Sequence, residues 1–458
     1  MKDIPDIVQD TNRTQYALGR LLGRGGQGAV YAVCGRDLAV KLSNVQNPEA
    51  RGRIRENIAR IKRLPLDGLN VARPLRALAP PQAGYVMELM TGMEAIGTIT
   101  RVPRAHTADF AQWYLDSGGL LRRLRLLARC AALMRDLHAR GLAYGDASPG
   151  NIFVSRDHSS FEVWLIDCDN IVHGTARRVI YTPGYAAPEL FGRYQGSDSL
   201  TDAWSLATIV FEALCVLHPF CGDLVHDGEP ELEERAWRGE LPWVDDEEDD
   251  TNFASRGLPR PMVLTPSLQK LAVECFGASR KERLRRPTAG AWAEKLHKAA
   301  DQVIVCPECT SSYYLNMKLC PWCNAPRPRF VIATVYLRDP SLTDQTRNPH
   351  SLVCRSAGRP QAIERAVIQP GRQAALTDRH LYGTRLQTAQ ALAELDADQL
   401  VLQGTQSCTH VLQHRRSGEI LPLAGRTERI DLGRGKTRWW LAPQQPEGLH
   451  RVVTFELH

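Results

Sequence analysis

The chain has 458 residues, which is too long for one compact hydrophobic core and predicts two or three domains. Its 43% hydrophobic and 24% charged residues are typical of a globular protein and argue against a disordered one. The net charge of +6 is small for this length, so the composition gives little support to nucleic-acid binding.

The N-terminal segment lacks the basic start and apolar run of a signal peptide, so we expect a cytoplasmic protein. The most apolar run extends from Leu206 to Leu217. It contains Glu212 and is too short to cross a bilayer, and we therefore expect no membrane anchor.

Residues 16–42 alternate short β-favouring runs with glycine-rich breaks, which predicts strands joined by tight turns. Gly23, Gly25 and Gly28 would let backbone N–H groups approach phosphate oxygens, although a glycine-rich hairpin turn explains the run equally well. Lys41 follows on a predicted strand, whereas a dinucleotide-binding fold would open a helix directly after the glycines. The lysine therefore favours a phosphate site of another type.

Residues 48–64 carry isoleucines at three- and four-residue steps, which predicts a helix with one buried face. A lysine that binds phosphates needs a carboxylate to hold it, and this helix offers Glu56 and Glu49. We prefer Glu56, because an acid at the helix start such as Glu49 also complements the helix dipole.

Three polar residues follow at turns in the next part of the chain. Asp146 and Asn151 come after a predicted long helix over residues 120–140, and Asp167 ends a predicted strand over residues 161–167. Each residue alone is more often a turn or capping residue. Their order and spacing after the glycines and the lysine make that explanation weak.

Together these segments resemble the Ser/Thr protein kinases over about residues 14–300, and bacterial members of the eukaryotic-like type in particular. Three further segments of the family pattern follow in order: Thr182 to Glu189, Asp202 to Leu206, and Arg286 to Thr288. The resemblance implies an α+β, bilobal kinase fold over residues 1–300, with an N-lobe at about 14–88 and a C-lobe at about 91–300. It also implies MgATP in the cleft between the lobes.

The resemblance implies a role for each polar residue. Asp146 would accept the proton of the substrate hydroxyl, while Asn151 and Asp167 would hold Mg²⁺. Lys41 would bind the α- and β-phosphates with Glu56 as its partner. The function implied is transfer of the γ-phosphate of ATP to a protein.

Other positions would bind ATP or stabilise the fold. The residues implied to surround ATP are the phosphate loop Gly23, Gly25 and Gly28, the adenine cover Val30 and Ala39, and the hinge backbone at Glu88 and Met90. Thr182 would contact the catalytic aspartate, which implies a Ser or Thr acceptor. Glu189 and Arg286 would form a buried ion pair that fixes the activation segment.

The chain departs from the family pattern near its catalytic residues. Tyr144 and Gly145 replace the usual His-Arg, so switching by activation-loop phosphorylation is not expected, and Ser148 replaces a lysine. Cys168 and Asp169 replace the Phe-Gly of Asp-Phe-Gly; Asp169 either adds a metal ligand or faces outward, and we favour the outward orientation. The competing hypothesis is a nucleotide-binding pseudokinase scaffold. We favour an active enzyme, because the charged residues that phosphoryl transfer requires are all present.

Two Cys-x-x-Cys pairs follow the kinase-like region. Cys306, Cys309, Cys320 and Cys323 predict a structural Zn²⁺ site with four thiolates, in a zinc ribbon over residues 301–328. A redox pair is the alternative, but no thioredoxin-like βαβ unit surrounds these residues.

Residues 329–458 are rich in β-favouring runs and predict a third domain. Its role is open: a partner-recognition module, for instance a small β-sandwich, and a domain that only stabilises the kinase are equally favoured. Kinases with a C-terminal zinc ribbon resemble those of bacterial systems that include a phosphatase and a von Willebrand A-type protein, some associated with tellurium resistance. These two proteins and a Ser/Thr-containing protein substrate are the partners that the resemblance implies, without nucleic acid or membrane.

Overall fold

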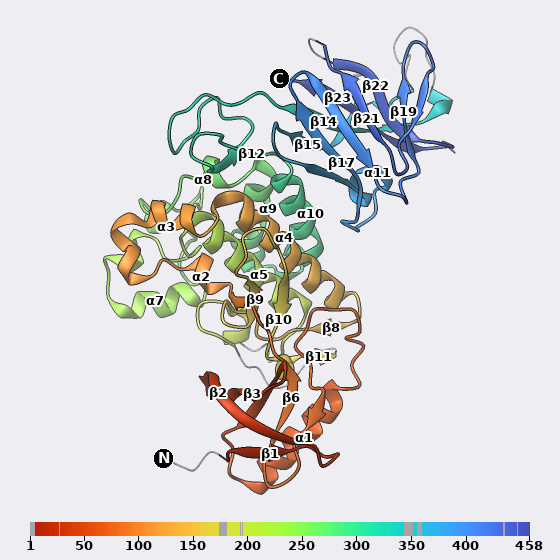
Figure 1. The fold of residues 1–458 in the computed structure, drawn as a ribbon. Helices are drawn as coiled ribbons and strands as arrows, with labels where there is room; N and C mark the ends of the chain where they lie inside the picture. Colours follow the sequence, from red (N-terminus) through yellow and green to blue (C-terminus); the bar gives the residue numbers. More distant parts are fainter. Residues whose placement is uncertain are drawn as a thin grey trace. The chain divides into compact units, whose positions relative to one another are not determined.

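The computed structural model describes residues 5–26, 28–173, 181–192, 194, 196–342, 351–354, 360–433, 436–446 and 448–458 (Figure 1). The chain forms two compact units, Met1–Leu296 and His297–His458. The expected boundary at residue 300 thus lies close to the division between the units. The expected zinc ribbon and β-rich domain both lie within the second unit. Among the described residues, no helix has both the length and the apolar character needed to cross a bilayer.

An antiparallel sheet opens the first unit, with the strand order β1-β2-β3-β4-β6-β5 (Figure 1). Its strands are β1 (Ile7–Gln9), β2 (Gln15–Gly25), β3 (Gly28–Val33), β4 (Leu38–Ser43), β5 (Arg76–Ala77) and β6 (Gly84–Glu88). Side chains alternate between the two faces of a strand, so Val40 packs into the core of this sheet while Lys41 lies on the other face.

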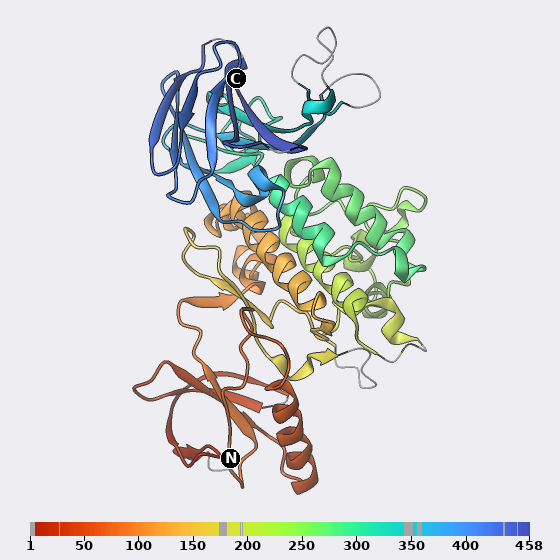
Figure 2. The same cartoon turned by 90° about the vertical axis from the view of Figure 1, so that its right-hand side faces the viewer.

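Helix α1 (Pro48–Ile61) packs beside this sheet against β5 and β6 (Figures 1 and 2). Its start is fixed by Asn47, whose side chain accepts the Glu49 N–H at 2.8 Å, and by Pro48 in the first turn. Ile58 and Ile61 are buried, which confirms the helix expected from the isoleucine spacing.

The rest of the first unit is mainly helical. Its helices are α2 (Gly97–Thr100), α3 (Phe110–Asp116), α4 (Gly119–His138), α5 (Ser199–Cys215), α6 (Asp223–His226), α7 (Pro230–Trp237), α8 (Arg260–Val263), α9 (Pro266–Phe276) and α10 (Ala289–Ala300). Helix α5 is buried along nearly its whole length and contacts both α4 and α9. Asp198 and Thr201 form a capping box at its N-terminus.

Short strands in this lobe position the loops of the candidate site. Strands β7 (Met93–Ala95), β9 (Ile152–Ser155) and β10 (Val163–Leu165) form one small sheet, and β8 (Leu142–Ala143) pairs with β11 (Val172–His173). The loop that contains Asp146 and Asn151 therefore connects β8 to β9. The 3-10 helices of this unit are η1 (Arg104–Asp109), η2 (Cys168–Asn170), η3 (Pro188–Phe191), η4 (Asp250–Asn252), η5 (Ala278–Arg280) and η6 (Arg283–Arg285).

The second unit is β-rich and contains two larger sheets. The first has the order β15-β14-β23-β22-β19-β20, and the second has the order β16-β17-β18-β21. The strands of the first are β14 (Val331–Arg338), β15 (Ala362–Ile368), β19 (His410–His414), β20 (Ile420–Pro422), β22 (Lys436–Pro443) and β23 (His450–Leu457). Those of the second are β16 (Ala374–Thr377), β17 (Ala389–Asp396), β18 (Gln399–Gly404) and β21 (Thr427–Asp431).

Residues of both sheets share one hydrophobic core, so this part of the unit is a β-sandwich. Its short helices are η7 (Pro340–Leu342) and α11 (Asp378–Tyr382). The four-cysteine segment carries a strand pair, β12 (Val303–Val305) and β13 (Ser312–Tyr314), and packs against the sandwich through Phe330, Ile332 and Val367. The α+β class, the two-lobed first unit and the β-rich tail agree with the fold expected from the sequence.

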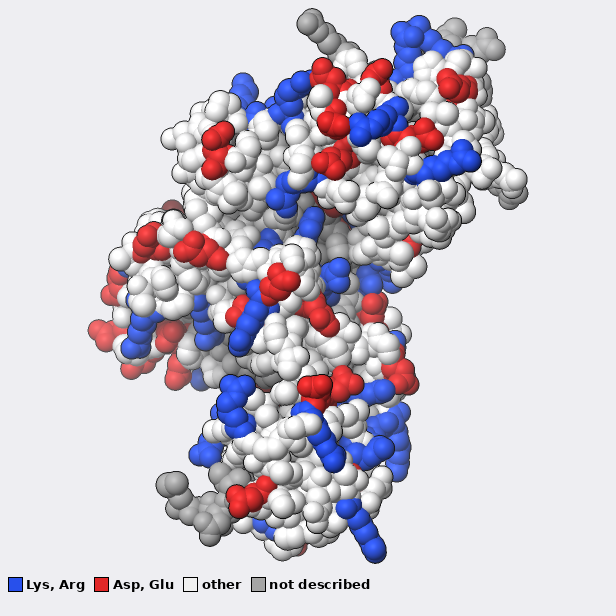
Figure 3. All heavy atoms as spheres, in the orientation of Figure 1, with Lys and Arg blue, Asp and Glu red and all other residues white. Residues whose placement is uncertain are grey.

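Positive and negative side chains are interspersed over the face of the molecule shown in Figure 3. This mixture agrees with a net charge of only +6. A mixed surface of this kind favours solubility and provides no extended field of one sign.

Candidate active site and four-cysteine cluster

Lys41 pairs with two carboxylates of one short segment. Its Nζ forms an ion pair with Asp167 and lies 2.6 Å from the carboxylate of Asp169. Burial disfavours the charged form of Lys41, but the charges of Asp169 and Asp167 outweigh burial and raise its pKa. Asp167 has left-handed backbone angles (φ +56°), which turn the chain out of strand β10 into η2 and present its carboxylate to the lysine.

Asp146 is held by two side chains that lie far apart in sequence. Asn151 Nδ2 donates to its Oδ2 at 3.1 Å, and Thr182 Oγ1 donates to its Oδ1 at 2.9 Å. Burial raises the pKa of Asp146, and the hydrogen bond from Thr182 opposes that shift without cancelling it. The structure therefore brings Asp146, Asn151 and Thr182 together, as expected.

Tyr144 links the Asp146 loop to the Asp167 segment. Its hydroxyl lies within hydrogen-bond distance of two carbonyl oxygens, that of Asn151 at 2.9 Å and that of Ile166, and its one hydrogen is directed between them. Asp202 on α5 accepts the N–H groups of Tyr144 and Gly145 at 2.6 and 2.9 Å. Tyr144 was not among the site residues expected from the sequence, and the hydroxyl that it carries in place of the family's histidine is the signal that could have identified it.

The glycines of the predicted phosphate loop fall into two kinds. A Cβ added to Gly23 or Gly25 would meet no other atom within 4 Å. Glycine at these two positions therefore leaves the space beside the loop open. A Cβ on Gly28 would instead lie 2.1 Å from the carbonyl oxygen of Leu42. Gly28 is therefore required by the close pairing of β3 with β4, whatever binds near the loop.

The residues expected to surround adenine lie on adjacent strands. Val30 on β3 is paired with Lys41, and Ala39 on β4 is paired with Met87. Glu88 is the last residue of β6, and Met90 lies two residues further on, in the connection to the helical lobe. The strand register thus places Val30, Ala39 and Glu88 on the neighbouring inner strands β3, β4 and β6 of the N-lobe sheet.

The expected partner of Lys41 on α1 is wrong. Neither Glu56 nor Glu49 pairs with Lys41 in the part of the chain that the structure describes, and both are exposed. The α1 side chains that face Lys41 across a cavity of about 790 Å³ include Arg53 and Asn57. Glu56 precedes Asn57 by one residue, and successive residues of a helix point in different directions, so Glu56 points to solvent.

Asp169 faces the lysine, contrary to the orientation that we favoured. Only 19% of its side chain is exposed, and it pairs with Lys41. Burial raises the pKa of Asp169, while the charge of Lys41 acts in the opposite direction. Its backbone carbonyl accepts a hydrogen bond from Asn57 Nδ2 at 2.9 Å, which ties the segment to α1.

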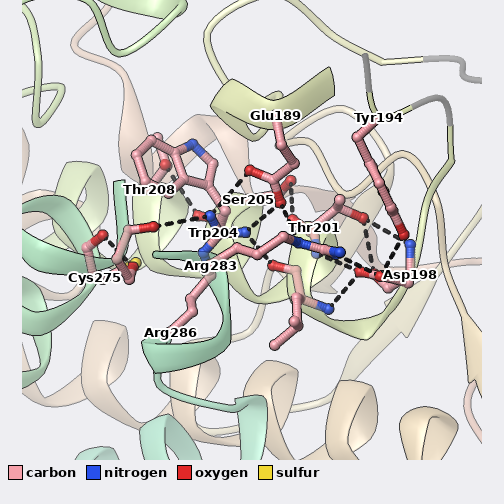
Figure 4. A network of polar contacts seen from close by, with 12 residues as sticks. Glu189, Tyr194, Asp198, Thr201, Trp204, Ser205, Thr208, Cys275, Arg283 and Arg286 are labelled. Atoms are coloured by element: carbon pink, nitrogen blue, oxygen red, sulfur yellow. Dashed lines mark hydrogen bonds and ion pairs between the residues drawn. The ribbon is translucent and has the colours of Figure 1, made fainter. Parts of the chain in front are cut away.

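A second polar network lies behind the site (Figure 4). Arg286, whose side chain is 0% exposed, donates to the two oxygens of Glu189 at 2.9 and 3.1 Å. Its guanidinium lies over the ring of Trp204 at 5.0 Å, and Arg283 joins Glu189 to Asp198. The predicted ion pair is present and connects η3 to helix α5 and the 3-10 helix η6.

The four cysteines of the second unit meet in one cluster. Their sulfur atoms all lie within 4.8 Å of one another, with Cys306 and Cys323 3.6 Å apart and Cys309 and Cys320 also 3.6 Å apart. Four thiolates at such distances can surround one tetrahedral metal ion and leave no position for a water. The donor set therefore fits zinc.

The two Cys-x-x-Cys turns have the same backbone geometry. The N–H of Cys306 donates to the carbonyl of Ser311, and that of Cys320 to Ala325, both at 2.8 Å. Thr310 and Asn324, which follow the second cysteine of each pair, have φ of +59° and +61°. This repeated turn orients both cysteines of each pair toward one point.

One lobe is a β-sheet whose strand lysine pairs with an aspartate just after strand β10, and the other is helical with a second aspartate held in a loop. This arrangement defines a protein kinase fold. The sequence agrees: the protein kinase domain family matches residues 16–295, and the chain belongs to this family.

Relatives in this family come from plants, animals and bacteria. The chain is 29% identical over 245 residues to CBL-interacting protein kinase 4 of rice (Oryza sativa), covering 50% of each protein. It is 28% identical over 221 residues to the DNA damage-responsive serine/threonine-protein kinase RqkA of Deinococcus radiodurans, covering 46% of this chain and 31% of that protein. MAP kinase-activated protein kinase 2 of Drosophila melanogaster is 26% identical over 193 residues, or 41% of this chain and 50% of that protein. The chain thus spans half or less of the length of these relatives.

Proposed function

We propose that the chain is an ATP-dependent protein kinase that transfers the γ-phosphate to Ser or Thr hydroxyls of a protein partner. One observation carries the proposal: Lys41 and Asp167 are in contact, and Asp146 is held in the same first unit by Asn151 and Thr182. Family membership and relatives named as Ser/Thr kinases support it.

Asp146 is the proposed base. It takes the proton of the acceptor hydroxyl while that oxygen bonds to the γ-phosphorus and the bond to the ADP oxygen breaks. Thr182 orients the carboxylate by donating to its Oδ1, and the resemblance associates a threonine at this position with a Ser or Thr acceptor. Lys41 neutralises the α- and β-phosphates, and Gly23 and Gly25 leave the phosphate loop open to them.

The residues present fit a magnesium site. Asp167 supplies a carboxylate, and Asn151 donates its amide nitrogen to Asp146, so its amide oxygen is the atom left for a cation. Mg²⁺ bound there would neutralise phosphate charge. Glu88 and Met90 would offer backbone groups to the adenine edge, with Val30 and Ala39 over its face.

The four-cysteine cluster is the proposed structural zinc site. The two matched turns and the sulfur distances support this assignment. The β-sandwich behind it is proposed as a partner-recognition or stabilising module within the second unit.

The relative from Deinococcus radiodurans supports a bacterial signalling or stress-response kinase. We propose a cytoplasmic location. A phosphatase and a von Willebrand A-type protein are proposed partners on the resemblance alone.

The test is transfer of ³²P from [γ-³²P]ATP with Mg²⁺ to a generic protein substrate. Asp146→Asn and Lys41→Ala should each lower transfer by about 10²- to 10⁴-fold, because one removes the base and the other the phosphate-binding charge. Asp227→Asn removes an exposed acid of the same unit and serves as the matched control. Transfer at the wild-type rate in both Asp146→Asn and Lys41→Ala would refute the proposal that this site catalyses phosphate transfer. No transfer by the wild type, with thermal stabilisation by nucleotide, would favour the pseudokinase scaffold.

A further inference from the structure

Two carboxylates of one segment share a single lysine. Asp167 and Asp169 both pair with Lys41, and the three side chains are 25%, 19% and 12% exposed in that order. A largely buried ammonium group needs a counterion at all times, because an unpaired buried charge is costly. The phosphates of bound ATP would themselves neutralise Lys41, but the lysine has to be held in place for them. The proposed mechanism gives Asp167 to magnesium, so a second acid has to do this.

Helix α1 does not supply that acid. The α1 residues that line the cavity beside Lys41 are Ala50, Arg53, Ile54, Asn57 and Arg60. None of them is acidic, and Glu56 is exposed on another face. The side of α1 that faces the lysine is therefore neutral or positive.

Helix α1 instead holds the backbone around Asp169. Asn57 Nδ2 donates to the carbonyl of Asp169 at 2.9 Å, and Arg60 donates to that of Ile171 at 2.8 Å. Arg60 also donates to Asn57 Oδ1 at 2.7 Å, which fixes the amide in the orientation that donates to the segment. These contacts leave the Asp169 carboxylate directed at Lys41, 2.6 Å from its Nζ.

We propose that Asp169 is the residue that positions Lys41 for the phosphates of ATP, in place of an acid on helix α1, and so leaves Asp167 for the metal. This inference rests on the proposed function. Asp169 acts through Lys41 and is a positioning residue, and α1 contributes by clamping the segment that carries it.

The first test compares Asp169→Asn with the wild type in the full chain. Without the carboxylate, Lys41 has to share Asp167 with Mg²⁺, so the KM for ATP should rise by about ten- to a hundredfold. Stabilisation of the protein by MgADP, read as the shift in Tm, should fall in parallel. Asp227→Asn again controls for loss of an acid.

The second test moves the carboxylate onto α1. Arg53→Glu in the Asp169→Asn background places an acid on the cavity-facing side of the helix and leaves the clamp of Asn57 and Arg60 intact, so it should recover part of the lost ATP affinity. A purely structural role of Asp169 would give no recovery. Glu56→Gln tests the rival residue: a loss as large as that of Asp169→Asn would overturn the proposal.

The outcomes separate this inference from the proposed function. Phosphate transfer by the wild type together with an unchanged KM in Asp169→Asn would refute the role of Asp169 and leave the kinase intact. No transfer by the wild type would refute the proposed kinase activity. The MgADP-induced Tm shift would still show whether Asp169 positions Lys41 for the phosphates. An unchanged shift in Asp169→Asn would overturn its role.

Discussion

The environment of Asp146 determines at which pH the proposed base can work. The carboxylate is largely buried, which raises its pKa, and the Thr182 hydroxyl stabilises the ionised form by donating to Oδ1 at 2.9 Å. Only the ionised carboxylate can accept a proton. Activity should therefore fall as pH decreases through the pKa of Asp146.

Removing the Thr182 hydroxyl should shift the acidic side of the pH–rate profile, where activity falls as pH decreases. In Thr182→Val the pKa of Asp146 rises further, so the loss of kcat/KM on acidification should begin at higher pH than in the wild type. A pH–rate profile measures this. Thr182→Ser keeps the hydroxyl and should retain the wild-type limb. An acidic limb that stays in place or moves to lower pH in Thr182→Val would contradict the assignment.

Sequence reasoning brought together Lys41, Asp146, Asn151 and Asp167 because their order and spacing follow a known family pattern. It failed for the partner of Lys41. Isoleucine spacing identifies the buried face of α1, but it does not show which flank of that face meets the lysine. The role of Asp169 depends on the turn at Asp167, where a left-handed backbone conformation directs the next residues, and no local pattern signals that turn.

At the scale of elements, the ion pair between Arg286 and Glu189 joins η3 to the helical lobe. Arg286 also donates to the carbonyl of Leu200 at 2.7 Å, at the start of α5. The arginine side chain is fully buried, so its removal leaves Glu189 without its bidentate partner and with only the longer contact to Arg283.

Arg286→Ala should therefore destabilise the first unit by about 3–5 kcal/mol. Denaturant unfolding of the full chain, followed by a signal from the first unit, measures the effect. Arg285→Ala is the matched control, because Arg285 is exposed and its nearest acid, Glu282, is 3.6 Å away. It should cost less than about 0.5 kcal/mol. Equal effects of the two substitutions would show that burial of the pair does not stabilise this part of the fold.

The elements themselves were predictable to different degrees. Helices α1 and α4 follow from apolar periodicity, and β10 lies within its expected run but ends at Leu165, before the turn at Asp167. In the second unit the strand runs were visible but their pairing was not. Strand β14 pairs with β23 at the far end of the chain, with Val331 opposite Leu457, and a local pattern carries no information about so distant a partner.

In the second unit, the four-cysteine segment should depend on a bound metal ion, whereas the β-sandwich has a large core of its own. The cysteine cluster lies in a small core with Ile304, Tyr313 and Phe330, which is too small to fold without further stabilisation. This predicts that zinc binding contributes directly to the stability of that segment.

Purified protein should contain about one zinc per chain by metal analysis. Cys320→Ser should lose the metal and lower the Tm of the second unit, whereas Cys34→Ser changes an exposed cysteine of the first unit and should keep both. Less than half a zinc per chain in protein purified without chelator would contradict the site.

The proposed kinase binds MgATP in one cleft, and Asp146 then takes the acceptor's proton. Single-turnover transfer by Asp146→Asn, at an MgATP concentration shown by calorimetry to saturate the variant, tests it most directly. If Asp146 is the base, the variant should bind MgATP about as well as the wild type does, while transfer is slowed by about 10²- to 10⁴-fold. Transfer at the wild-type rate from the saturated variant would contradict it.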